Sequence, residues 1–135
     1  MQLVLADLNK MKFDIANASV VTMNWTLQFV RPTCREMLLK KICRGMVTNG
    51  ALILCEKILV EFSLLNRLYI ELYYNFKRRN GYTDLEIAKK REALENVLIP
   101  YRVEENIGLL RKCGFEVVDT PFRWYNWSSF IAFKT

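Results

Sequence analysis

Residues 75–97 read NFKRRNGYTDLEIAKKREALENV and contain the clearest local signals in this 135-residue chain. Asn80-Gly81 predicts the end of a helix, because glycine readily adopts the left-handed conformation that closes a helix C-terminus. Thr83-Asp84-Leu85-Glu86 is a capping box, which predicts that a second helix begins there. Pro100 ends that helix or follows its end. The stretch therefore predicts two consecutive helices joined by a tight turn.

The residues before this stretch alternate between strand-like and helix-like patterns. Apolar side chains recur at helical spacing over residues 62–79, and Thr33 is a suitable N-cap for a helix over residues 34–46. Short apolar runs predict three buried strands, over residues 2–8, at the start of residues 19–29 before a loop, and over residues 51–55. Strands that alternate with helices are typical of a parallel α/β sheet.

The residues after the stretch predict one more helix and an antiparallel ending. Residues 104–113 have acids in the first helical turn and bases in the last, with Gly114 as C-cap. Strand-like runs follow, with a hairpin turn near residues 125–128, at residues 115–118, 122–125 and 129–133. The length allows a single domain over residues 1–135.

Composition excludes several classes of function. The chain has no histidine, so catalytic triads, general bases and metal sites built on histidine are excluded. Its 4 cysteines include no Cys-x-x-Cys pair, which argues against zinc and favours free thiols in the cytoplasm. No apolar run is long enough to span a bilayer, so no membrane association is expected. The net charge of +6 is compatible with an anionic ligand, although an ordinary solvated surface is the commoner explanation.

Four motifs together resemble one known family. They are NWTLQF at residues 24–29, NGALILCEK at 49–57, FKRRNGY at 76–82 and KREALENV at 90–97. In this order they are similar to the C-terminal half of carboxy-S-adenosyl-L-methionine synthases, which have the class I S-adenosylmethionine-dependent methyltransferase fold. The resemblance implies a transferase that makes carboxy-S-adenosylmethionine from S-adenosylmethionine and prephenate. It also implies a role in modification of the tRNA wobble uridine, by way of a separate enzyme.

The resemblance assigns cofactor-binding roles to four residues. Asp7 matches an acid that accepts the adenine amino group, and Leu8 lies beside it. Asn24 matches a polar residue at the carboxyl end of a strand, where doubly wound sheets bind ligands. Arg91 matches the arginine that pairs with the extra carboxylate of carboxy-S-adenosylmethionine, for which a guanidinium fork is suited. Taken without the family, Asp7 could end a strand, Asn24 could cap a loop and Arg91 could be one more solvated charge.

Part of the family pattern has no counterpart in this sequence. The 5 glycines never come closer than five residues apart, so the glycine-rich loop that holds the cofactor is missing. The resemblance therefore implies a partial doubly wound sheet with a C-terminal antiparallel hairpin, lacking the first two strands. A helical segment, about residues 60–100, is then inserted after the third predicted strand. We expect weak binding of S-adenosylmethionine by this chain alone, and either a homodimer or a complementing N-terminal half as partner.

Two other functions remain open from the sequence. The chain could be a non-catalytic remnant that acts as an oligomerisation or interaction module, with the apolar face of residues 62–76 as a dimer contact; an intramolecular core is the alternative for that face. A basic module that contacts tRNA through Lys77, Arg78 and Arg79 ranks last, because the same residues belong to the family motif.

Overall fold

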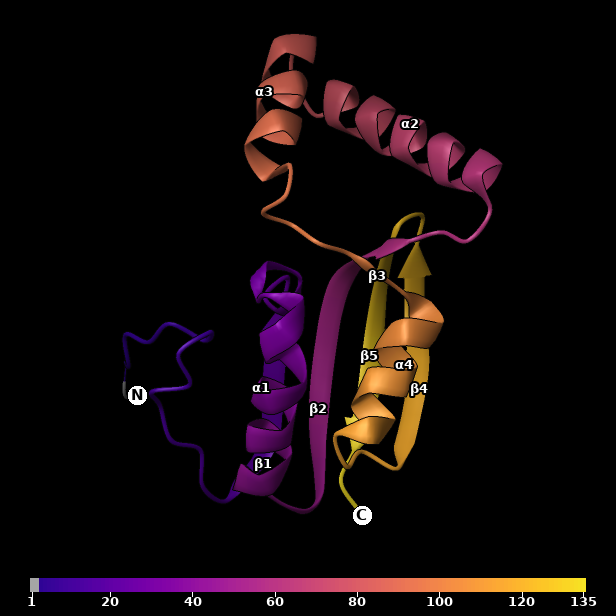
Figure 1. Cartoon of the computed structure of the whole chain (residues 1–135). Coiled ribbons are helices and arrows are strands. Elements are labelled where there is room, and N and C mark those ends of the chain that lie inside the picture. Colours follow the sequence, from indigo (N-terminus) through magenta and orange to yellow (C-terminus); the bar gives the residue numbers. More distant parts are fainter. Residues whose placement is uncertain (1–2) are drawn as a thin grey trace.

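The computed structural model describes residues 3–135, which form a mixed sheet, helices on one of its faces, and two further helices beyond one end (Figure 1). The elements in chain order are β1 (Ala18–Asn24), the 3-10 helix η1 (Leu27–Phe29), α1 (Pro32–Gly45), β2 (Met46–Leu59), α2 (Ser63–Arg79), α3 (Asp84–Leu94), β3 (Tyr101–Arg102), α4 (Val103–Lys112), β4 (Val117–Trp124) and β5 (Trp127–Phe133).

The sheet has the strand order β1-β2-β5-β4, and the short β3 pairs in parallel with the C-terminal end of β2. β1 pairs with β2 in parallel, whereas β5 is antiparallel to both β2 and β4. The parallel crossover through α1 and the C-terminal hairpin confirm the predicted partial doubly wound fold with an antiparallel ending. Within residues 3–135, β1 pairs with a strand on one side only, so its other edge is open.

The core lies between the sheet and the two helices α1 and α4. α1 contributes Leu38 and Leu39, and the sheet contributes Leu54 and Phe130, all with fully buried side chains. Lys112 of α4 forms an ion pair with Glu36 of α1, with Nζ 2.6 Å from Oε2, so the helices lie side by side on one face. Side chains alternate along a strand, which turns residues such as Ile53 to the opposite face, where they are only half-buried.

The strand predicted over residues 2–8 does not form. Met1 and Gln2 lie outside the described residues, and residues 3–7 have no regular structure before a turn at residues 8–11. Asn9 holds this turn against the start of α1, because its Oδ1 accepts the Arg31 N–H at 2.9 Å. Within residues 3–135 this segment has no strand partner, and it instead packs against the core through Leu8.

Other predicted boundaries shift for local reasons. α1 begins at Pro32 rather than after Thr33, because proline is well suited to the first helical position. The three predicted C-terminal strands are two longer ones, β4 and β5, joined at Tyr125 and Asn126. The bulge between Asp119 and Phe122 accounts for the break that the sequence suggested.

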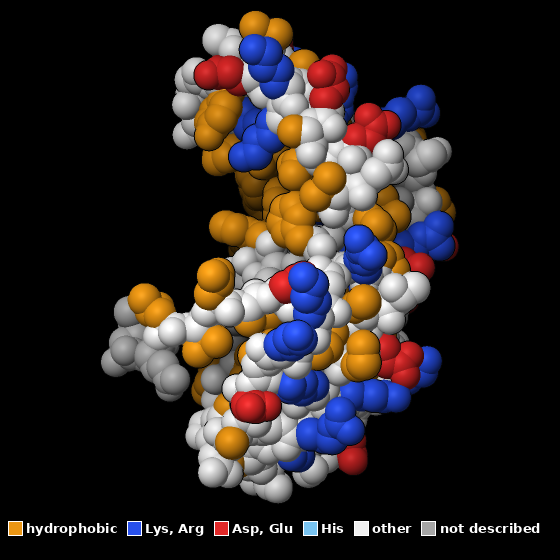
Figure 2. Space-filling view, turned by 60° about the vertical axis from the view of Figure 1, so that its left-hand side comes forward, with side chains coloured by type: hydrophobic (Ala, Val, Ile, Leu, Met, Phe, Trp, Pro, Cys, Tyr) orange, Lys and Arg blue, Asp and Glu red, His pale blue; other side chains and the backbone are white. Residues whose placement is uncertain are grey.

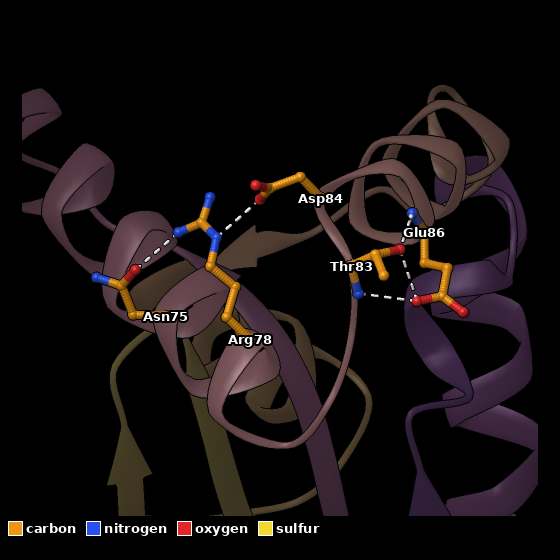
Figure 3. Close-up of polar contacts among 5 residues, drawn as sticks. All are labelled: Asn75, Arg78, Thr83, Asp84 and Glu86. Atoms are coloured by element: carbon orange, nitrogen blue, oxygen red, sulfur yellow. Dashed lines mark hydrogen bonds and ion pairs between the residues drawn. The ribbon is translucent and has the colours of Figure 1, made fainter.

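We refer to α2 and α3 as the helical arm, which rises from the C-terminal end of β2 (Figure 1). The predicted stop and start signals are confirmed: α2 ends before Gly81, which has a φ of +89°, and Thr83 and Glu86 form the capping box. Arg78 joins the two helices, because its Nε donates to Asp84 Oδ1 at 2.7 Å (Figure 3). No residue of α2 is buried.

Candidate functional site: a cavity between the helical arm and the sheet

A cavity of about 1200 Å³ lies between the helical arm and the end of the sheet where β1 and β2 terminate. The space-filling view shows this hollow below the overhanging arm, with hydrophobic side chains over much of its surface (Figure 2). The carboxyl ends of parallel strands are the usual ligand-binding edge of a doubly wound sheet. Within the described part of the chain, the cavity is therefore the strongest candidate for a functional site.

One wall of the cavity is aromatic. Its members come from the end of β1, from α2 and from the β4–β5 hairpin, and they are Trp25, Tyr73, Phe76, Trp124 and Trp127. Ring centroids lie 5.8 Å apart for Trp25 and Trp127, and 5.0 Å apart for Phe76 and Trp124, with edge-to-face geometry. These contacts attach α2 to the hairpin and give the cavity a wide apolar surface.

The other wall is cationic. Four basic side chains line it, namely Lys57 from β2, Lys77 from α2, and Lys90 and Arg91 from α3. Glu95 is the one acidic residue that lines the cavity within residues 3–135. Burial, followed by repulsion from Lys90 and Lys57, lowers the pKa of Lys77, whose Nζ lies 4.7 Å from the centre of the Tyr73 ring. The wall is thus suited to a ligand that carries negative charge.

Glu56 fixes the loop that forms the base of the cavity. Its buried carboxylate accepts the backbone N–H groups of residues 26–28, at 3.2, 2.8 and 2.9 Å. Burial raises the pKa of Glu56 to about 7, against the opposing effect of these amides and of Arg35. The side chain therefore works as a cap for η1, and it determines where Trp25 and Phe29 lie along the cavity.

Arg35 connects that loop to the chain segment that returns from the arm. It is buried, and its Nη2 donates to the carbonyl oxygens of Gln28 and Ile99, at 3.2 and 2.6 Å. The guanidinium carbon also lies 4.2 Å from the centre of the Tyr101 ring. Because both segments border the cavity, Arg35 helps to hold its shape without facing it.

The structure places the four predicted site residues in different surroundings. Arg91 lines the cavity. Asn24 ends β1 immediately before Trp25, and its backbone carbonyl accepts the Thr26 hydroxyl at 3.0 Å. Asp7 and Leu8 lie on the N-terminal segment and do not line the cavity; Asp7 Oδ1 accepts the Asn9 N–H at 3.0 Å, and this bond chiefly lowers the pKa of the Asp7 carboxyl. The structure does not test the cofactor contacts that the resemblance assigns to them.

Sequence reasoning missed most of the cavity. Trp25 and Lys57 belong to family motifs to which no binding role is assigned, and Trp127 belongs to the predicted hairpin turn. Lys77 is a candidate for tRNA contact in the sequence analysis, and Lys90 enters it only as the first residue of the motif at residues 90–97. Their common location depends on how the arm folds back over the sheet, which the spacing of residues along the chain does not encode.

Comparison with curated proteins gives close relatives. The chain is 53% identical over 133 residues to a carboxy-S-adenosyl-L-methionine synthase from Methylococcus capsulatus, covering 98% of this chain and 54% of that protein. It is 44% identical over 124 residues to the synthase from Nautilia profundicola, covering 92% of this chain and 53% of that protein. The chain is a partial homologue of the carboxy-S-adenosyl-L-methionine synthases. It spans about half the length of these synthases, and the predicted resemblance is confirmed.

Solved structures support the fold. Human N-acetylserotonin methyltransferase, in complex with SAM, has a TM-score of 0.63 at 16% identity, covering 96% of this chain and 32% of that one. A SAM-dependent methyltransferase from Thermotoga maritima has a TM-score of 0.58 at 20% identity, covering 92% of this chain and 60% of that one. These similarities show a partial methyltransferase fold. No family model matches the sequence.

The structure was also searched for metal-ion sites and for membrane-spanning helices. Within residues 3–135, no group of Cys, Asp and Glu side chains is arranged to hold a metal ion. None of the helices in that range is both long and apolar enough to cross a membrane.

Proposed function

We propose that this chain contributes half of a carboxy-S-adenosyl-L-methionine synthase, a transferase that forms carboxy-S-adenosylmethionine from S-adenosylmethionine and prephenate. The observation that carries the proposal is the position of Arg91, on the cationic wall of a cavity at the ligand-binding edge of the sheet. The sequence identity to the synthases supports it independently.

The cavity is better suited to the carboxylates of the reacting molecules than to the adenine of S-adenosylmethionine. Arg91 and the neighbouring lysines can pair with carboxylates, and the aromatic wall can exclude water from them. In this role Arg91 binds and orients the new carboxylate, since a guanidinium stays charged at neutral pH. Asp7 and Leu8, which the resemblance assigns to the adenine, lie away from the cavity, so we expect that segment to change position when the remaining part of the site is present.

The remaining part of the site would come from a complementing N-terminal half, either in the same polypeptide or in a second one. The open edge of β1 supports this, because an unpaired strand edge readily accepts another strand. We also propose a cytoplasmic location, and a role in tRNA wobble-uridine modification that supplies the carboxymethyl group without contact to tRNA. Arg78 supports the last point, because it is bonded to Asp84 and Asn75 within the arm.

The test is a product assay. The chain would be mixed with a polypeptide that corresponds to the uncovered part of the Methylococcus capsulatus synthase, together with S-adenosylmethionine and prephenate. Mass spectrometry should detect carboxy-S-adenosylmethionine only when both polypeptides are present, and Arg91→Ala should abolish it. Absence of product from a folded, associated pair would refute the proposal.

A second candidate is a non-catalytic interaction module that forms homodimers. It is favoured by the start of α2, where Phe62, directly before the helix, and Leu64 are 66% and 70% exposed. Apolar residues grouped in this way often mark a protein contact. Sedimentation would distinguish it: Leu64→Lys should shift a concentration-dependent dimer to monomer, whereas Arg67→Lys at an exposed position of the same helix should not.

A further inference from the structure

Lys57 borders the cavity without an anionic partner. Its backbone N–H donates to Gln28 Oε1 at 2.8 Å, which fixes the point on β2 from which the side chain leaves. Within residues 3–135, no ion pair or hydrogen bond involves its ammonium group. Burial lowers the pKa of Lys57, as expected for a half-buried ammonium group that lacks a counter-charge. A charge in this situation is stabilised when an anion binds next to it.

Two more ammonium groups share this part of the cavity. Lys77 and Lys90 come from the two helices of the arm, and Lys77 lies close enough to Lys57 and Lys90 for their charges to depress its pKa. Three like charges from segments far apart in sequence repel one another. The fold keeps them together although Glu95 is the one acid lining the cavity in the described part of the chain.

The aromatic residues beside these lysines restrict the shape of the ligand, since Lys57 on β2 pairs with Trp127 on β5. Trp124 and Trp127 of the hairpin face the same cavity as the lysines. The Trp127 Nε1 is buried, and no hydrogen-bond acceptor lies within reach of it among residues 3–135. A ligand with an apolar ring and polar substituents fits this space, and one of its substituents can accept a hydrogen bond from the Trp127 Nε1–H.

We propose that Lys57, together with Lys77 and Lys90, binds a carboxylate other than the one paired with Arg91, so that the cavity selects a dicarboxylate on a compact apolar ring. Lys57 is then a residue that determines substrate specificity. The inference deepens the proposed function and rests on it for the identity of the ligand, since prephenate is a dicarboxylate of this kind. It predicts that the cavity binds an anionic ligand more tightly than an uncharged one, and this difference can be measured as binding, without any reaction.

Tryptophan fluorescence provides the measurement, because all 3 tryptophans of the chain line the cavity. The chain would be titrated at pH 8 with prephenate and with phenylacetone, which has a six-membered ring and a ketone side chain but no carboxylate. We expect tighter binding of prephenate. Lys57→Met should weaken prephenate binding about 10-fold or more, the usual effect of losing a charge-assisted contact, and phenylacetone binding by less than about 3-fold.

Two further variants guard against a folding artefact. Lys90→Met, on an exposed helix position, should weaken prephenate binding in the same selective way, whereas Lys89→Met, beside it but not lining the cavity, should not. Equal affinity of the wild type for both ligands, no binding of either, or unchanged prephenate binding by Lys57→Met and Lys90→Met would overturn the inference. If these variants bind as the wild type while the product assay succeeds, this inference alone fails. If prephenate binding depends on Lys57 but no product forms, the proposed function fails.

Discussion

The sheet with α1 and α4 is built differently from the helical arm, although both are rich in apolar residues. In the first region, Leu39, Leu54 and Phe130 are fully buried. In the arm, Ile87 is the one buried apolar residue described, and Leu64 and Leu68 are exposed. Burial of apolar area is the main source of folding stability, so the sheet region carries most of it.

The difference bears on function, because the arm supplies much of the cationic wall. Lys77, Lys90 and Arg91 belong to it, and it is attached to the sheet mainly through the aromatic contacts of Tyr73 and Phe76. A binding element that is held by few buried contacts can adjust to a ligand more easily than the core can. The sheet region therefore positions Lys57 and the tryptophans, and the arm supplies the other cationic residues of the same cavity.

Matched truncations of a leucine in each region should differ most in their effect on stability. Leu39→Ala should lower the free energy of unfolding by about 2–5 kcal/mol, because it opens a cavity in the core. Leu68→Ala on α2, which is 45% exposed, should lower it by less than about 1 kcal/mol. Urea denaturation followed by circular dichroism measures both. Equal losses would contradict the division into a buried core and a weakly attached arm.

The pH dependence of stability should isolate Glu56 in the core region. Its pKa is raised to about 7, so the folded chain keeps a proton that the unfolded chain releases near its ordinary pKa of 4.5. Stability should therefore fall as pH rises from about 4.5 to about 7, by at most about 3 kcal/mol, and then stay level. Since the chain has no histidine, few other side chains titrate in this window.

Glu56→Gln is the control for this prediction. The variant removes the titrating group but keeps an acceptor for the η1 amides, so the slope between pH 5 and pH 7 should disappear in urea denaturation. A slope that persists unchanged in Glu56→Gln would assign the pH dependence to another group.

Loss of the N-cap of α3 should have the smallest effect on stability, limited to the arm. Thr83→Ala removes the N-cap of α3, in which the Glu86 N–H is donated to Thr83 Oγ1 at 3.3 Å (Figure 3). The cost should be about 1 kcal/mol, confined to α3. Hydrogen exchange should show faster exchange of the α3 amides and unchanged protection of β2 and β5. Equal loss of protection in both regions would mean that the arm and the sheet unfold as one unit.

Local signals in the sequence predicted the helix boundaries of the arm, but they did not predict which of its residues line the cavity. The capping box at Thr83 and the stop at Gly81 depend on neighbours within a few residues, and both are confirmed. The strand over residues 2–8 was wrong, because strand formation depends on partners that an apolar run alone does not reveal. Arg91 was found only through a family motif, and the convergence of Lys57 and Trp127 with it is a property of the tertiary fold.

The proposed function depends on Arg91, which we propose recognises the carboxylate of carboxy-S-adenosylmethionine in this cavity. Calorimetric titration of the chain with its complementing half would compare carboxy-S-adenosylmethionine with S-adenosylmethionine, in the wild type, in Arg91→Ala and in the control Arg79→Ala, at a position outside the cavity. We predict tighter binding of the carboxylated ligand by the wild type and Arg79→Ala, and loss of that preference in Arg91→Ala. Equal affinity for both ligands in the wild type, or a preference that survives Arg91→Ala, would contradict the claim.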